Sequence, residues 1–176
     1  MQDKKPNCLR IIAGGNFTLS PLQEFLPEIE KLLGKKISLS LAPEEQILSL
    51  LTQNADILCE SQILALFLNP DRFFQKKENK ENTTDVVKTL CRTIENFSHE
   101  YPGEIFIFLC PSAHLSDQNI RSVERVLQNL KKEKNITIFS YKKINRYHAC
   151  YTVFNAYTEQ QAGVPYSREY YHLLTT

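Results

Sequence analysis

Apolar residues gather in five short runs separated by longer amphipathic or polar stretches. The runs cover residues 8–13, 37–41, 63–68, 105–110 and 136–140. Most of them are bounded by turn residues and lack a strict alternation of apolar and polar side chains. This is typical of strands that are buried on both faces. The pattern predicts a parallel sheet of five strands.

Between these runs, apolar residues recur three or four positions apart, as they do on one face of a helix. The first helix is marked by Leu22, Leu26, Ile29, Leu32 and Leu33. Pro21 lies near its start, and Pro27 inside the pattern either kinks the helix or marks its true start. Further helices are predicted at residues 43–51, 84–100 and 116–130, and a terminal one is predicted to pack the tyrosines at 166, 170 and 171.

Strands that alternate with helices favour a sheet covered by helices on both faces. The expected fold is therefore an α/β three-layer sandwich with a mostly parallel five-stranded sheet. The chain has 176 residues, 42% of them hydrophobic, which fits a single domain over residues 1–176. Residues 75–84 include no apolar side chain and are expected to form a flexible loop.

Charge and cysteine content narrow the function classes. The chain has 21 Lys and Arg against 20 Asp and Glu, so its net charge of +1 gives no reason to expect nucleic acid or an anionic membrane as partner. Five widely spaced cysteines indicate neither a disulfide framework nor a metal site, and no cofactor is expected. The N-terminal stretch resembles neither a signal peptide nor a membrane span, so we expect a cytoplasmic location.

Polar residues follow three of the predicted strands at the point where each strand ends. Gly14, Gly15, Asn16, Phe17 and Thr18 follow the first strand. The third strand is followed by Asn69 and Asp71, and the fourth by Ser112 and His114. Because the carboxyl ends of parallel strands meet at one edge of a sheet, these residues are expected to form a binding pocket there.

Each of these groups also has a purely structural interpretation. Gly14 and Gly15 either let a ligand approach the backbone or only form a tight turn. Phe17 occupies a position that a dinucleotide-binding loop keeps small, so a Rossmann cofactor is not expected. Thr18 either points into the pocket or caps the first helix.

The later groups have similar alternatives. Asn69 and Asp71 supply an amide and a carboxylate, yet Asn-Pro-Asp is also an ordinary turn. Cys110 with His114 is a candidate thiol–imidazole pair, although a cysteine that ends an apolar strand is typical of a core residue.

Three phrases of the sequence resemble a known family. They are residues 13–22 (AGGNFTLSPL), 43–47 (PEEQI) and 163–171 (GVPYSREYY). Together they are similar to the N-terminal SGNH-hydrolase-like domain of FkbH-like proteins of polyketide biosynthesis, and the resemblance covers nearly the whole chain. It implies a flavodoxin-like α/β fold. Because these proteins handle groups on carrier proteins, it also implies an acyl carrier protein or an adjoining synthase domain as partner.

The resemblance implies the loss of two catalytic groups. Active SGNH members carry a nucleophilic serine just after the first strand, where this sequence has Phe17, and a histidine before the Pro-Tyr phrase, where it has Gly163. Glu159 stands where the aspartate paired with that histidine is expected, and Asn69 or Asp71 matches an asparagine-bearing loop. A hydrolase needs an activated nucleophile. The expected protein is therefore non-catalytic or strongly divergent.

Two alternatives remain open at this point. One is an active esterase or acyltransferase with a rearranged site that uses Thr18, or Ser112 with His114. The other is a structural or dimerising module, and the sequence leaves the oligomeric state open.

Overall fold

The protein is built on one five-stranded parallel sheet. The computed structural model describes residues 8–44, 46–53, 58, 60–74, 80–140, 142, 152–162 and 164–175, and of residues 80–84 it describes the backbone alone. The strands are β1 (Cys8–Gly15), β2 (Lys36–Leu41), β3 (Ile63–Leu68), β4 (Glu104–Leu109) and β5 (Ile136–Ser140). They pair in the order β2-β1-β3-β4-β5 and all pairs are parallel, so the predicted sheet is confirmed.

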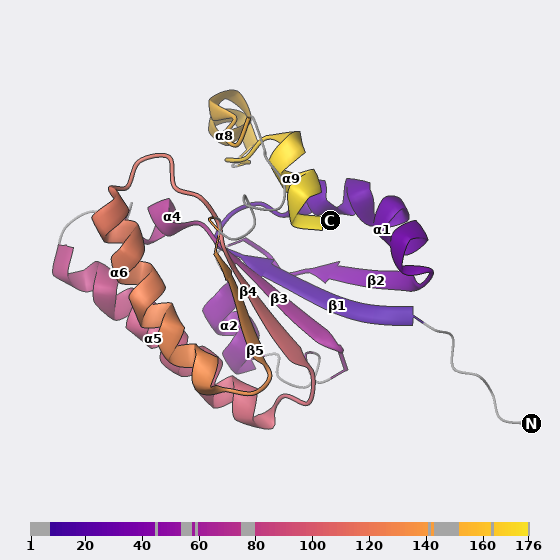
Figure 1. Ribbon diagram of the computed structural model, residues 1–176, viewed down its shortest axis with the longest axis horizontal. Coiled ribbons are helices and arrows are strands. Elements are labelled where there is room, and N and C mark those ends of the chain that lie inside the picture. The colour runs from indigo at the N-terminus through magenta and orange to yellow at the C-terminus, as the bar shows by residue number, and fades with distance from the viewer. Residues whose placement is uncertain are drawn as a thin grey trace, which may run out of the picture.

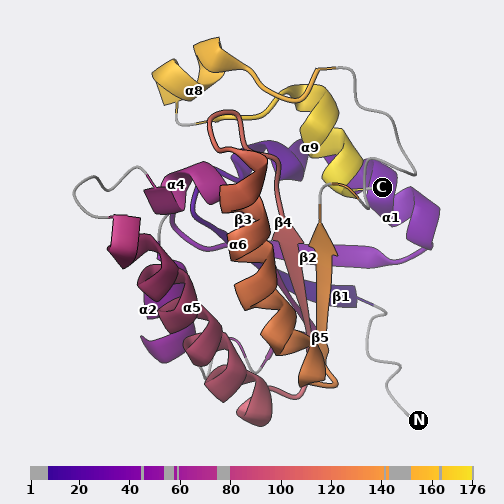
Figure 2. The ribbon, with the colours of Figure 1, turned by 60° about the vertical axis from the view of Figure 1, so that its left-hand side comes forward.

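Helices form a layer on each face of this sheet. Among the described residues they are η1 (Ser20–Phe25), α1 (Leu26–Leu33), α2 (Ile47–Gln53), α4 (Pro70–Phe74), α5 (Lys80–Glu100), α6 (Asp117–Gln128), η2 (Asn129–Lys132), α8 (Ala156–Ala162) and α9 (Arg168–Thr175). Helices α2, α5 and α6 lie on one face, whereas α1 and α9 lie on the other (Figures 1 and 2). The predicted three-layer α/β sandwich is therefore confirmed.

The core is divided by the sheet into two clusters. Strand β3 shows the division, because its side chains point alternately to the two faces. Leu64, Leu66 and Leu68 pack with residues of α2, α5 and α6, whereas Ala65 and Phe67 pack with residues of η1 and α9. This second cluster extends to the carboxyl edge of the sheet, where the candidate site lies.

The first helical segment shows how local sequence sets an element boundary. A short 3-10 helix, η1, ends at Phe25, and α1 begins at Leu26 with Pro27 in its first turn. Proline is tolerated there because the first N–H groups of a helix have no partner within it. Gly34 ends α1 with a φ of 61°, a conformation that glycine adopts at little cost. Pro27 therefore marks the true start of the helix.

Four sequence-based expectations need correction. Thr18 does not cap the first helix, because the N-cap of η1 is Leu19 and no side chain bonds there. Helix α5 begins at Lys80 rather than Thr84, so the predicted loop at 75–84 is wrong from residue 80 onward. The reason is that the first turn of a helix can consist of polar residues alone. Residues 75–79 lie outside the described residues. Strand β2 lies at the sheet edge and is not buried on both faces. The short helices α4 and α8 were not predicted.

In the described part of the chain, no helix combines the length and the apolar character needed to cross a membrane.

Candidate functional site

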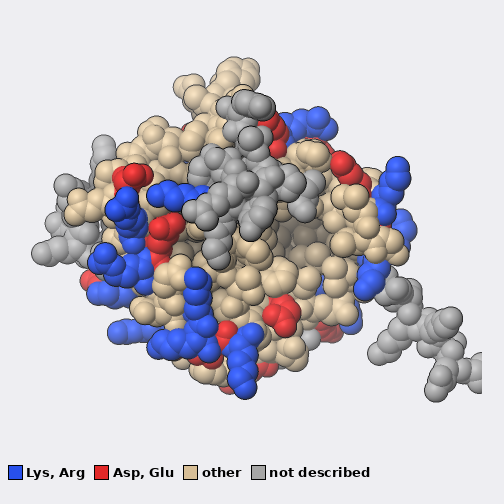
Figure 3. Space-filling model, in the orientation of Figure 1, with Lys and Arg blue, Asp and Glu red and all other residues tan. Residues whose placement is uncertain are grey.

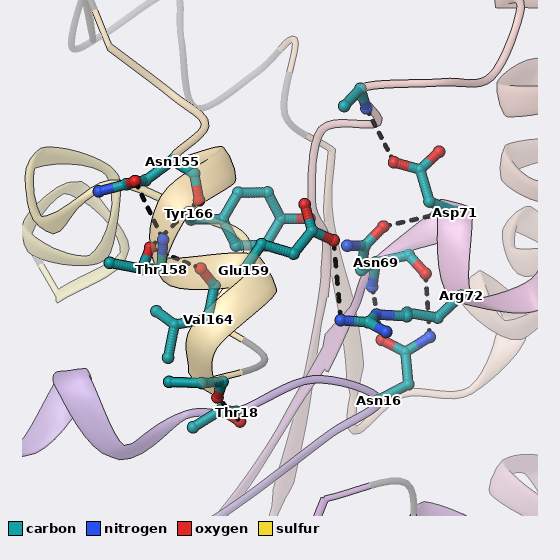
Figure 4. Close-up of polar contacts among 12 residues, drawn as sticks. Asn16, Thr18, Asn69, Asp71, Arg72, Asn155, Thr158, Glu159, Val164 and Tyr166 are labelled. Carbon is teal, nitrogen blue, oxygen red and sulfur yellow. Dashed lines mark hydrogen bonds and ion pairs between the residues drawn. The ribbon is translucent and has the colours of Figure 1, made fainter.

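Three strand ends meet at the carboxyl edge of the sheet, as the sequence predicted. We call this region the rim and define it as residues 14–18, 69–72 and 111–114. Asn16 joins the first two of its segments through a reciprocal pair of hydrogen bonds (Figure 4). Its side-chain amide donates to the Asn69 carbonyl at 2.9 Å, and its Oδ1 accepts the Asn69 N–H at 2.7 Å. Both asparagines are buried, so this pair fixes the two loops relative to each other.

Asp71 joins the second and third segments of the rim. Its backbone N–H donates to Asn69 Oδ1 at 2.9 Å, which is the bond of an ordinary Asx turn. Its carboxylate accepts the hydroxyl hydrogen of Ser112 and, at 2.8 Å, the N–H of Ala113. The Asn-Pro-Asp phrase is thus a turn that also anchors the loop after β4.

Ser112 uses its hydroxyl to hold that loop together. While it donates to Asp71, its oxygen accepts the N–H of Leu115 at 2.8 Å and that of His114 at 3.3 Å. His114 therefore meets Ser112 through its backbone, and its side chain is exposed. The proposed pairing of Ser112 with the His114 imidazole is not formed in this arrangement.

Phe17 lies in the core, although the sequence placed it in the pocket. Its side chain is 1% exposed. Its ring packs edge to face against Tyr166, with centroids 5.0 Å apart, and also contacts Tyr171. Tyr166 is itself fixed at the rim, because its hydroxyl donates to the Pro111 carbonyl at 2.9 Å. Phe17 therefore contributes an aromatic core side chain beside the rim.

The two glycines of the rim are close-packed against the chain itself. A Cβ at Gly14 would lie 3.2 Å from Leu50, and one at Gly15 would lie 3.2 Å from Leu19. Such distances are shorter than ordinary contacts, so a side chain at either position would force its neighbours to shift. Both glycines pair with β3 as the last residues of β1, opposite Leu66 and Phe67, so they do not form the tight turn that the sequence offered as one interpretation.

Thr18 faces a carboxylate. Its hydroxyl donates to Glu44 Oε2 at 2.6 Å and lies 3.4 Å from the Ala162 carbonyl. Its own carbonyl accepts the Tyr171 hydroxyl at 2.8 Å. A carboxylate is a weak base toward an aliphatic hydroxyl. The contact therefore ties Thr18 in place and gives no strong activation.

An ion pair connects the rim to the C-terminal segment. Arg72 on α4 lies 3.7 Å from Glu159 on α8, and the two side chains are 20% and 29% exposed. Glu159 thus reaches the rim through an arginine that sequence reasoning missed (Figure 4). The available signal for Arg72 was its place next to Asp71 in a strand-end loop. Gly163 lies outside the described residues.

Cys110 ends the fourth strand as a core residue. It is 2% exposed and belongs to the same cluster as Phe17 and the three tyrosines of the C-terminal segment. Burial raises the pKa of its thiol to about 12. Because only the thiolate is a strong nucleophile, the candidate pair of Cys110 with His114 is not supported.

We expect this buried thiol to make the protein less stable at alkaline pH. The unfolded thiol ionises near pH 8.5 and the folded one near pH 12, so above pH 8.5 the unfolded state binds fewer protons. Stability should be unaffected below that pH and should fall by up to about 1.4 kcal/mol per pH unit above it. Urea unfolding of Cys110→Ala between pH 7 and 10 should show a shallower fall, whereas Cys8→Ala should follow the wild type. Equal slopes in all three proteins would contradict the assignment.

Comparison with known proteins places this arrangement on a recognised scaffold. No family model matches the sequence, and no curated protein sequence matches it. Solved structures do match. A predicted lipolytic protein of the G-D-S-L family from Desulfitobacterium hafniense superposes with a TM-score of 0.60 at 13% identity, over 94% of this chain and 95% of that one. A predicted acylhydrolase from Bacteroides fragilis gives 0.56 at 12% identity, over 98% and 85%.

The fold is that of the GDSL-type, or SGNH, hydrolases.

A further match is to part of a larger protein. The N-terminal part of protein BF1531 from Bacteroides fragilis, which contains a phosphatase domain and was crystallised with magnesium, gives a TM-score of 0.75 at 12% identity. The match covers 97% of this chain and 50% of that chain, so this chain spans half of the larger one. At such identities the likeness defines the fold alone.

Acyl transfer by a serine-hydrolase mechanism needs a hydroxyl that is hydrogen-bonded to an imidazole. Among the described residues of the rim, no hydroxyl is hydrogen-bonded to an imidazole. Thr18 and Ser112 each donate to a carboxylate instead. The described rim is a network of braced loops with one half-buried ion pair and one exposed histidine.

Proposed function

We propose that this protein is a non-catalytic SGNH-fold domain of polyketide or hybrid peptide–polyketide biosynthesis that recognises an acyl carrier protein. The burial of Phe17 carries the proposal that the domain is non-catalytic. The resemblance places this residue where active SGNH proteins have their nucleophile, and here the residue is 1% exposed and packs against Tyr166 as part of the core. The hydroxyls of Thr18 and Ser112, which are held by carboxylates, support it further.

Two likenesses support a carrier protein as the partner. The phrases at residues 13–22, 43–47 and 163–171 resemble the N-terminal domain of FkbH-like proteins, which handle groups on carrier proteins. The structural match to the N-terminal part of BF1531 is to a chain that contains a phosphatase domain. Both are consistent with a binding domain that presents a carrier protein to a catalytic domain.

A titration tests the proposal. Isotope-labelled protein should show chemical-shift changes in residues 112–116 and around Arg72 when a carrier protein bearing its phosphopantetheine arm is added. His114→Glu should weaken binding at least tenfold, because this exposed side chain lies on the rim. His99→Glu is the matched control, since His99 is an exposed histidine at the end of α5, outside the rim, and should bind like the wild type. Absence of any shift with loaded and unloaded carrier proteins would refute the proposal.

We also expect no serine-hydrolase activity. A fluorophosphonate probe should leave the protein unlabelled, and p-nitrophenyl acetate should turn over no faster than in buffer, because the rim hydroxyls lack an imidazole base. The measurement is mass spectrometry of the probe-treated protein together with a rate assay. Labelling or turnover that disappears in Thr18→Ala or His114→Ala would favour the rearranged esterase instead.

A further inference from the structure

One face of the sheet carries an apolar groove of about 220 Å³. We call it the sheet-face groove. Its floor includes Ala65 of β3 and Phe106 and Phe108 of β4, and its walls include Ile29 of α1 and Leu174 of α9. In the space-filling view of Figure 3 a hollow among tan residues marks this face, between the positions of α1, α9 and β1 in Figure 1. The groove is separate from the rim, because no residue of the rim lines it.

The groove exposes side chains that a doubly wound sheet normally buries. On the opposite face of the same strands, Ile105 and Ile107 are 0% exposed, whereas Phe106 and Phe108 are only half-buried. Phe108 stacks against Phe67 with ring centroids 4.7 Å apart, and against Phe139 at 5.0 Å. A row of phenyl rings that spans three strands is an apolar surface that gains free energy when it is covered.

The size of the groove limits its occupant. Pockets for drug-sized ligands are larger, about 300–1,000 Å³, than the 220 Å³ of this groove. A slender ligand such as a single alkyl chain suits this small volume.

Positive charge lies at one end of the groove. Leu33 and Ile37 both line it, and Lys35 and Lys36 lie between them in the chain, Lys36 as the first residue of β2. Lys36 is paired with Glu30 at 2.8 Å, whereas Lys35 is exposed and adds a further cation. Blue atoms in Figure 3 lie at this right-hand end of the hollow, where α1 turns into β2. An anionic group at this end complements the charge.

Near the other wall, the charges balance. Arg168 pairs with Glu24 at 3.1 Å, and His172 lies 3.0 Å from Glu28, so both acidic residues there have basic partners. Lys35, between α1 and β2, has no acidic partner in the described contacts, and neither has Lys31 in the last turn of α1. This asymmetry gives the groove a direction: apolar along its length and cationic at one end.

We propose that the sheet-face groove binds a medium-chain fatty acid, with the alkyl chain along the phenyl row and the carboxylate beside Lys35. The site is independent of the carrier-protein surface on the rim, and each is tested separately. Each methylene group that enters the groove should raise the affinity about fourfold. The increase should stop when the chain outgrows the groove.

Titration calorimetry with butanoate, hexanoate, octanoate and decanoate, each below its micelle concentration, tests the proposal. Affinity should rise steeply along the series, and octanoate should bind more tightly than octanol. Lys35→Glu should abolish the preference for octanoate over octanol, whereas Lys132→Glu, the matched change on η2, should leave it intact. Ile29→Trp, which fills the groove, should end the chain-length increase at a shorter acid.

Several results would overturn the inference. The first is an affinity for the acids that does not depend on chain length. The second is an equal effect of Lys35→Glu and Lys132→Glu on the preference for octanoate. The third is a dimer in sedimentation that persists with the fatty acid but dissociates in Leu33→Glu, because the groove would then be a dimer interface. Lys35 and Lys132 are exposed, so both variants should fold, and their thermal unfolding checks this. Octanoate binding without carrier-protein binding would refute the proposed function alone, and the reverse would refute this inference alone.

Discussion

Replacing Phe17 by serine should lower the free energy of unfolding by about 3–5 kcal/mol and should create no esterase activity. Phe17 is 1% exposed, and its ring contacts Tyr166 and Tyr171, so its removal loses apolar burial and leaves a cavity. The new hydroxyl would lie among aromatic rings, where an unpaired polar group costs further free energy. The loss is measured by urea unfolding at neutral pH.

A matched substitution separates burial from ring chemistry. Tyr157→Ser also removes an aromatic ring, but Tyr157 is 74% exposed, so its stability should change by no more than about 0.5 kcal/mol. A stable Phe17→Ser protein that reacts with a fluorophosphonate would show that position 17 faces the pocket, in conflict with the observed packing.

The strands of this fold could be predicted from the sequence because a strand that is buried on both faces is a continuous run of apolar residues. A run such as residues 63–68 contains no polar side chain, since alternate residues enter the two core clusters. The hydrophobic pattern of an edge strand is weaker. Strand β2 is exposed at every second position, and its place at the sheet edge depends on the order of pairing, which no local pattern shows.

The sequence predicted the location of the candidate site but not the orientation of its side chains. Parallel topology brings the ends of β1, β3 and β4 together, and the Asn16–Asn69 and Asp71–Ser112 contacts confirm that they meet. The direction of each side chain could not be predicted. Phe17 turns inward because Tyr166 and Tyr171, about 150 residues later, offer it an aromatic cavity. Such choices depend on distant partners and not on spacing near a strand end.

Replacing Asp71 by asparagine should destabilise the protein by about 2–3 kcal/mol. The carboxylate is 6% exposed and accepts two hydrogen bonds, from the Ser112 hydroxyl and from the Ala113 N–H. An amide keeps one oxygen and turns an NH₂ group toward one of these donors, so one charge-assisted bond becomes a clash of two donors. The change should appear as a lower urea midpoint with an unchanged m-value.

A double-mutant cycle shows whether this loss comes from the loop contact. Ser112→Ala should lower the free energy of unfolding by less than Asp71→Asn does. Because both substitutions remove the same hydrogen bond, the sum of the two single losses should exceed the loss in the double variant by at least about 1 kcal/mol. Asp85→Asn is the control, since Asp85 is an exposed aspartate that pairs with Lys88 and should matter by about 0.5 kcal/mol or less. Additive losses would mean that Asp71 stabilises the fold through contacts other than Ser112. If Asp71→Asn also weakens carrier binding in proportion to its effect on stability, the Asp71 contact acts on function by holding the 111–114 loop in place.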